Sequence, residues 1–173
     1  RNGVAASCTR TGDGAVSAPG LRRPASQKLL FLAQIVRAEA DLLTLTDGRL
    51  FAVQMDAERA GTLRADIDLG ERVDAFVARF GRLQDTLADK LLPEILAWLG
   101  EPVGPAIDNL ARAERLGWIA DAQAWFEARQ LRNRMIHEYV RDPEVLAAAL
   151  SAGHGAVGLL VVAARTLASL VEA

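Results

Sequence analysis

The residues of this chain that could do chemistry gather in one short stretch, Leu131–Tyr139. It holds Arg132, Asn133, His137 and Tyr139, which include one of the two histidines and the single tyrosine of the 173-residue chain. A histidine titrates near neutral pH and can move a proton, and a guanidinium can stabilise charge on phosphoryl oxygens. This combination suits proton transfer beside a phosphate group.

Helical spacing places these side chains on two neighbouring sides of one helix. At about 100° per residue, Arg132 and Tyr139 share one side, and Asn133 and His137 form an i, i+4 pair on the next. Arg129 lies one turn before Arg132 and could add affinity for a phosphate. A long arginine side chain can reach round the helix, so Arg132 and His137 could act on one phosphate.

Spacing alone leaves two interpretations of this stretch open. In the first, His137 is an ordinary, partly buried histidine near a helix end, and Tyr139 is a core or interface residue. In the second, both belong to a site. His154, between two glycines, is expected to be structural, and Arg134 is expected on a solvated face with the acidic residues of the same helix.

The rest of the sequence predicts a helical scaffold for this stretch. Hydrophobic residues make up 51% of the chain and aromatic residues 5%, and apolar residues recur at steps of three and four. Ser26, Asp121 and Asp142 are expected helix N-caps, and Asp47-Gly48 is expected to end the first helix. We expect helices over residues 29–45, 70–98 with a kink or break before Pro93, 105–117, 122–140 and 143–171.

The predicted fold is therefore all-α, an antiparallel bundle of about five helices formed by residues 26–173. Residues 1–25 lack periodicity, are rich in glycine and proline, and are expected to be a disordered tail. The last helix is uncharged between Glu144 and Arg165 and long enough to span a membrane. Its serine, glycine and alanine residues favour a buried bundle helix, so no membrane association is expected.

Charge and cysteine content limit the classes of function. The net charge is −2, so an RNA site would have to be local and built from a few arginines, in one subunit or two. Cys8 is the single cysteine, which excludes an intramolecular disulfide and fits a cytoplasmic protein. No cysteine and histidine spacing suits zinc, and Asp85, Asp89 and Glu94 do not make a convincing metal site, so no metal or cofactor is expected.

The pattern Arg132-Asn133-x-x-x-His137-x-Tyr139 resembles the Arg-x4-His-x-Tyr signature of the HEPN superfamily. Within that superfamily it most resembles the HepT-type toxins that are paired with minimal nucleotidyltransferases. The resemblance covers about residues 26–172 and leaves the tail outside. It extends to three flanking segments, Lys90-Leu91-Leu92-Pro93, Leu116-Gly117-Trp118-Ile119 and Asp142-Pro143.

This resemblance implies a HEPN-like bundle that acts as a metal-independent endoribonuclease, with its site at a homodimer interface. His137 would be the general acid or base, Arg132 would stabilise the phosphate, and Asn133 and Arg129 would support RNA binding. Tyr139 would accept AMP from a cognate nucleotidyltransferase antitoxin, which would neutralise the toxin. The alternative is a non-catalytic helical subunit that binds substrate for a nucleotidyltransferase.

Overall fold

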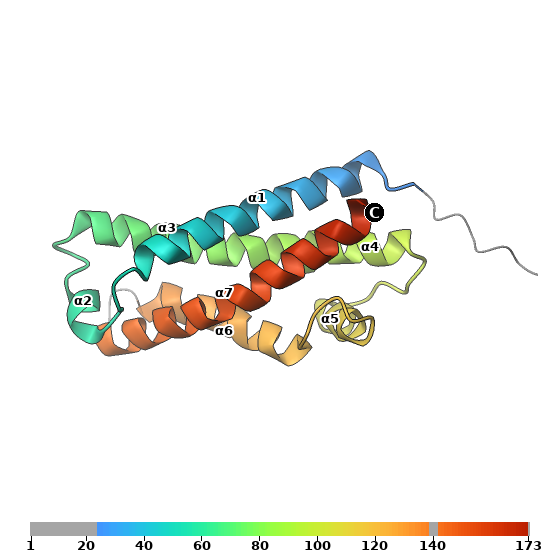
Figure 1. Ribbon diagram of the computed structural model, residues 1–173. Coiled ribbons are helices and arrows are strands. Elements are labelled where there is room, and N and C mark those ends of the chain that lie inside the picture. The colour runs from blue at the N-terminus through green and yellow to red at the C-terminus, as the bar shows by residue number, and fades with distance from the viewer. Residues whose placement is uncertain (1–23, 139–141, 173) are drawn as a thin grey trace, which may run out of the picture.

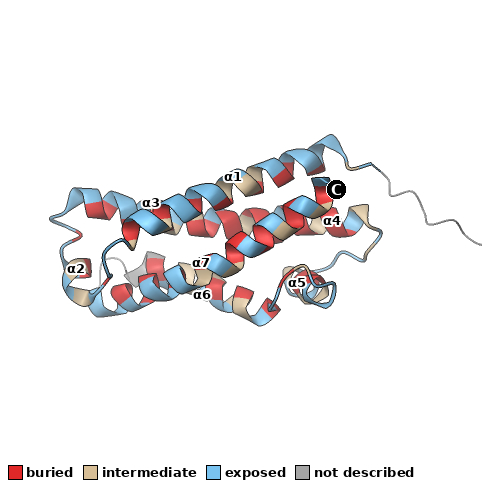
Figure 2. Ribbon diagram, in the orientation of Figure 1, coloured by how far each residue is buried: buried red, intermediate tan, exposed pale blue. Residues whose placement is uncertain are grey.

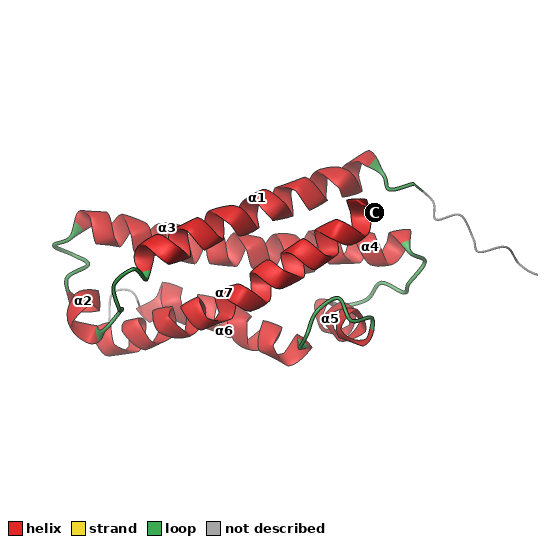
Figure 3. Ribbon diagram, viewed as in Figure 1, coloured by secondary structure: helices red, strands yellow, loops and turns green. Residues whose placement is uncertain are grey.

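The computed structural model describes residues 24–138 and 142–172, and every regular element within them is helical (Figures 1 and 3). The expected all-α bundle is therefore confirmed. The elements are α1 (Gln27–Leu50), α2 (Ala57–Gly61), α3 (Ile67–Asp85), the π-helical segment η1 (Thr86–Leu91), α4 (Leu92–Trp98), α5 (Ala106–Arg115), α6 (Ala122–Glu138) and α7 (Pro143–Glu172). When α3, η1 and α4 are counted as one continuous rod, the described residues form six helices. The helix beyond the expected five is the short α2.

Helix α1 begins where the sequence predicts and ends later. The Ser26 hydroxyl oxygen accepts a hydrogen bond from the Leu29 amide at 3.1 Å, which confirms the N-cap. The expected end at Asp47-Gly48 is wrong, because the helix continues to Leu50. Leu50 is fully buried, and the Phe51 amide donates to the Asp47 carbonyl at 2.9 Å, so tertiary packing holds a last turn that contains Gly48. The expected tail, residues 1–25, lies outside the described residues except for its last two.

The long rod α3–η1–α4 changes its helical pitch where the sequence contains Pro93. It starts at Ile67, three residues before the expected Gly70, because the Asp66 carboxylate caps the Leu69 amide at 2.9 Å. The predicted kink or break before Pro93 takes the form of η1, in which the Leu92 amide bonds to the Leu87 carbonyl five residues back. A proline has no amide hydrogen and crowds the preceding turn, so it disfavours a regular α-helical turn directly before it.

Local capping sets the ends of the last three helices. Gly117, with φ of 73°, ends the turn after α5, and the Trp118 amide bonds to the Ala113 carbonyl at 2.9 Å. The Asp121 carboxylate caps α6 through the Ala124 amide at 3.0 Å. Asp142 caps α7 through the Glu144 amide at 2.9 Å. These three caps agree with the sequence prediction.

The helices enclose one apolar core, and their buried faces point inward in Figure 2. Helix α7 crosses the front of the molecule in Figure 1 and packs against α1, α2 and α6. Gly153 brings α7 close to the core, because a Cβ there would lie 3.2 Å from Met135 Sδ and 3.3 Å from Phe76 Cε1. Its neighbours in α3 and α6 therefore occupy the space that a side chain would need.

Helix α7 is also the one described helix with the length and composition to cross a membrane. Only 44% of its most apolar window is buried inside the bundle. A core helix of a helical bundle meets the same criteria, so this property does not identify a membrane protein.

A half-buried acid near η1, Glu39, predicts an unusual dependence of stability on pH. Burial raises the pKa of Glu39 above 4.5, although a hydrogen bond with Thr86 opposes the shift, and its Oε2 has no hydrogen-bond partner within the described residues. The folded state therefore holds this proton more tightly than the unfolded state. The Glu39 contribution to the free energy of unfolding should fall as pH rises from 4.5 through the raised pKa.

Glu39→Gln should consequently raise Tm at neutral pH and have a smaller effect near pH 4, measured by thermal unfolding. The exposed Glu127→Gln is the control, and an equal effect of both substitutions at neutral pH would contradict the assignment.

Candidate functional site

The side chain of Arg132 extends from α6 across to α3. Its Nη2 lies 3.5 Å from Asp85 Oδ2, and its side chain is 32% exposed. The guanidinium passes over Gly81, where a Cβ would lie 2.5 Å from Arg132 Nε. Gly81 thus leaves the space, and Asp85 supplies the charge, that hold this arginine against α3.

A second arginine joins the same acidic side of the rod. Arg129 Nη2 lies 3.3 Å from Asp89 Oδ2 and 3.9 Å from Asp85 Oδ1. We call Asp85, Asp89, Arg129 and Arg132 the arginine–aspartate cluster. Its two positive and two negative charges compensate, and partly exposed pairs of this kind are each worth about 0–1 kcal/mol. The cluster therefore orients its arginines more than it stabilises the fold.

The other expected site residues follow Arg132 along α6. Asn133 is exposed, and the buried Met135 fixes the side of the helix that faces the core. The backbone of His137 belongs to the last turn of α6, and its side chain lies outside the described part of the structure. Tyr139 lies outside the described residues altogether. The structure thus brings Arg129 and Arg132 together and places Asn133 beside them on the solvent side.

The partners in α3 and η1 were missed from the sequence, where Asp85 and Asp89 were considered only as metal ligands. Gly81, Asp85 and Asp89 recur at steps of four, so they share one side of the long rod. That spacing was the available signal. It does not say which helix faces them, because the pairing with α6 is a tertiary contact. Within the described residues no group of three or more His, Cys, Asp or Glu side chains could hold a metal ion.

His154 forms a structural link between α7 and the end of α1. Its Nδ1 lies 2.7 Å from Asp47 Oδ1, and its ring stacks on Phe51 with centroids 4.3 Å apart and planes 18° apart. Phe51 in turn contacts Phe76 edge-on at 5.4 Å. These contacts agree with the expected structural role of this histidine.

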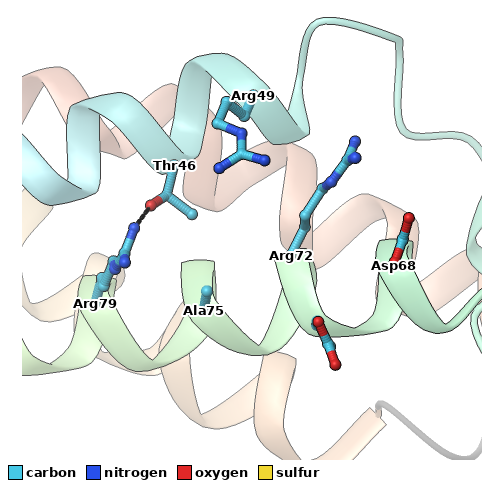
Figure 4. Close-up of a pocket in the computed structure, with 7 residues that line it drawn as sticks. Thr46, Arg49, Asp68, Arg72, Ala75 and Arg79 are labelled. Atoms are coloured by element: carbon cyan, nitrogen blue, oxygen red, sulfur yellow. Dashed lines mark hydrogen bonds between the residues drawn. The ribbon is translucent and has the colours of Figure 1, made fainter.

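A separate hollow of about 290 Å³ lies between α1 and α3 (Figure 4). Arg49 comes from the last turn of α1, and Asp68 comes from the first turn of α3, which are the positions that the helix dipoles favour for these charges. Arg79 donates a hydrogen bond to the hydroxyl of Thr46 and is thereby tied to α1. The hollow contains no residue of the arginine–aspartate cluster, and the helix ends account for two of its charges, Arg49 and Asp68.

The contact between Gly81 and Arg132 predicts that a methyl group on α3 will move an arginine on α6. In Gly81→Ala the guanidinium of Arg132 must leave its place, and Asp85 keeps only its more distant partner in the cluster, Arg129. Stability should change little, since the helical preference of alanine, about 1 kcal/mol, offsets the lost exposed pair. The Nε–H NMR signal of Arg132, assigned with Arg132→Lys, should shift. Gly48→Ala, which adds a methyl group in open space within α1, should leave the signal unchanged, and an unshifted signal in Gly81→Ala would refute the contact.

The chain was also compared with known proteins. No protein-family model, curated protein or solved structure matched it. The motif residues and the arginine–aspartate cluster are therefore the features of the chain that bear on its function.

Proposed function

We propose that this chain is a HEPN-type, metal-independent endoribonuclease toxin whose site is centred on Arg132 and His137. The observation that carries the proposal is the sequence pattern Arg132-x4-His137-x-Tyr139, together with the position of Arg132, which α3 holds half-buried at the surface. An arginine that is fixed on one side and still open to solvent on the other can bind a phosphate with the N–H donors on its solvent side.

The chemistry assigned to these residues is transfer of a phosphoryl group within RNA. A ribose 2′-hydroxyl loses its proton and attacks the adjacent phosphorus, and the bond to the 5′-oxygen breaks as that oxygen gains a proton. His137 serves one of these proton transfers. Arg132 stabilises the negative charge that develops on the phosphoryl oxygens. Asn133, exposed beside Arg132, orients His137 or the phosphate, and Arg129 supports RNA binding.

Charge compensation in the cluster is the observation that favours a second candidate. Because Asp85 and Asp89 balance both arginines, the described part of the site has no net positive charge to attract RNA. A non-catalytic subunit that binds substrate for a nucleotidyltransferase would need no such attraction. The complete motif favours the nuclease, since a binding bundle has no need of an arginine, a histidine and a tyrosine at this spacing.

The proposal includes a homodimer, a cytoplasmic location and a cognate minimal nucleotidyltransferase antitoxin. A dimer would bring together two copies of a motif that holds one histidine per chain. The antitoxin would transfer AMP from ATP to Tyr139. In that step the tyrosine oxygen loses its proton and attacks the α-phosphorus, and pyrophosphate leaves. The added phosphate would place negative charge and bulk beside the motif and block RNA.

Substitution of the two central residues tests the nuclease. Expression of the wild-type chain without its antitoxin should arrest growth, and the purified chain should cleave RNA. His137→Ala should lower the cleavage rate by about 10²–10⁴-fold, the usual loss when a general acid or base is removed. Arg132→Ala should lower it by about 10²–10³-fold, because a donor to the developing charge is lost.

The exposed Arg134→Ala is the matched control, since it removes an arginine from the same helix outside the proposed site and should keep full activity. If the wild-type chain, unmodified at Tyr139, neither arrests growth nor cleaves RNA, the proposal of a toxin is wrong. The non-catalytic, substrate-binding subunit then becomes the better explanation. If RNA is still cleaved after both substitutions, the chain is a nuclease, but its site is not formed by Arg132 and His137.

Modification of Tyr139 is a separate expectation. When the chain is expressed with its nucleotidyltransferase, mass spectrometry should find the mass of one AMP group on the peptide that contains Tyr139, and growth should continue. Tyr139→Phe should stay unmodified and should arrest growth in the presence of the partner. Neutralisation of Tyr139→Phe by the partner would show that the antitoxin acts in another way.

A further inference from the structure

The hollow between α1 and α3 has charges that the helix ends do not explain. Arg49 and Asp68 suit the helix dipoles, whereas Arg72 lies further along α3. Arg72, Ala75 and Arg79 follow one another at steps of three and four, so they share one side of α3. Arg49 faces that side from α1 (Figure 4). Three guanidinium groups from two helices therefore border one hollow, and we call them the α1–α3 arginines.

One of the α1–α3 arginines is held in place. Arg79 donates hydrogen bonds through Nη1 to the hydroxyl of Thr46 and, at 3.3 Å, to the carbonyl of Leu42. Thr46 is buried, so its hydroxyl is a fixed part of the wall. A guanidinium has five N–H donors, and both bonds use the same nitrogen, so Arg79 can bind an anion as well.

The other two α1–α3 arginines have no counter-ion. Arg49 and Arg72 are exposed, and within the described residues they make no hydrogen bond or ion pair. Asp68 lies one turn before Arg72, but Figure 4 shows its carboxylate at the far end of the hollow, beyond Arg72. Like charges that lie close together repel one another, and an anion between them replaces this repulsion with attraction.

The floor of the hollow leaves room for a ligand. Ala75 lies between Arg72 and Arg79 on α3, and its methyl group points toward Arg49 in Figure 4. The hollow measures about 290 Å³, close to the lower limit of about 300 Å³ for small-molecule sites. Guanidinium groups that approach from several directions suit the oxygens of a tetrahedral phosphate better than the two coplanar oxygens of a carboxylate.

Two carboxylates limit the length of the ligand. Asp68 and Glu71 line the hollow together with the three arginines, which leaves one net positive charge. Both precede Arg72 in the sequence, so they lie toward the N-terminus of α3, whereas Ala75 and Arg79 lie away from it. An anion that extended along α3 toward its N-terminus would meet these carboxylates and be repelled. A compact anion above Ala75 avoids them.

We propose that the hollow between α1 and α3 binds a small phosphorylated anion, with a diphosphate as the ligand that fits it best. Arg79 supplies a fixed donor, and Arg49 and Arg72 close on the anion from α1 and α3. Three guanidinium groups offer more donors than one phosphate can use, which favours two linked phosphates. The inference goes beyond the proposed nuclease and does not rest on it, since none of the proposed site residues lines the hollow.

Calorimetric titration of the full chain with inorganic pyrophosphate tests the site. The wild type should bind it, and saturating pyrophosphate should raise Tm, because a ligand stabilises the folded state that binds it. Arg49→Gln and Arg72→Gln should each raise Kd by about tenfold or more, since each removes a charged donor. Arg134→Gln, which removes an exposed arginine of α6 outside the hollow, should leave Kd unchanged. A wild type that does not bind, or an equal loss in all three variants, would overturn the proposal.

Removal of a negative charge should have the opposite effect, which a loss of folding cannot imitate. Glu71→Gln should lower the Kd for pyrophosphate by up to about fivefold, the range of exposed charge interactions. Asp74→Asn removes a charge from an exposed position of α3 that does not line the hollow, and its effect should be smaller. An unchanged or raised Kd in Glu71→Gln would place the anion outside the hollow.

Two longer ligands test whether the anion is small and where it comes from. ADP carries a diphosphate, and its binding with the same dependence on Arg49 and Arg72 would identify the ligand as a nucleotide. If pyrophosphate binds and ADP does not, the ligand is the free anion. Single-stranded RNA with methylated 2′-hydroxyls, which removes the attacking group, should bind no more weakly to Arg49→Gln than to the wild type. RNA that binds more tightly than pyrophosphate and loses affinity in Arg49→Gln would reject the small anion and assign the hollow to an RNA surface.

Discussion

The close approach of α6 to both α3 and α7 is the constraint on which the rest of the structure depends. Two glycines permit it: Gly81 leaves room for Arg132, and Gly153 leaves room for Met135 and Phe76. Because Met135 is buried between its neighbours, the rotation of α6 about its own axis is fixed. That rotation brings Arg132 to α3 and leaves Asn133 in solvent. Dense packing thus determines the direction in which polar side chains of the same helix point.

The position of Arg132 in the proposed site depends on α3 as much as on α6, the helix to which Arg132 belongs. Asp85 holds Arg132 through Nη2, and a guanidinium has five N–H donors, so it can bind a carboxylate and a phosphate together. The same carboxylate lowers the local positive charge, so an anionic substrate gains less from long-range attraction than it would from unpaired arginines. On the proposed function, binding therefore depends on short-range hydrogen bonds and on shape. This is consistent with a chain whose overall charge is −2.

Features that depend on neighbouring residues could be predicted from the sequence, whereas those that depend on distant contacts could not. Ser26, Asp121 and Asp142 cap helices because each lies directly before an apolar periodic segment, and all three were predicted. The extension of α1 past Gly48 was not predicted, because it relies on burial of Leu50 by other elements. The contact of Arg132 with Asp85 was also missed, since the periodicity of a helix reveals its exposed side and not its neighbour.

The π-helical segment η1 also determines which side of the rod its apolar side chains face. Leu83, Leu87, Leu91 and Ile95 are fully buried and recur at steps of four. In a straight α-helix each such step would turn a side chain by about 40° from the one before, and the row would spiral out of the core. The wider turn of η1 takes up part of that excess rotation, so one apolar row stays on the core side along the rod. The length of this segment is therefore as tightly constrained as its composition, because loss of one residue would rotate α4 by about 100° relative to α3.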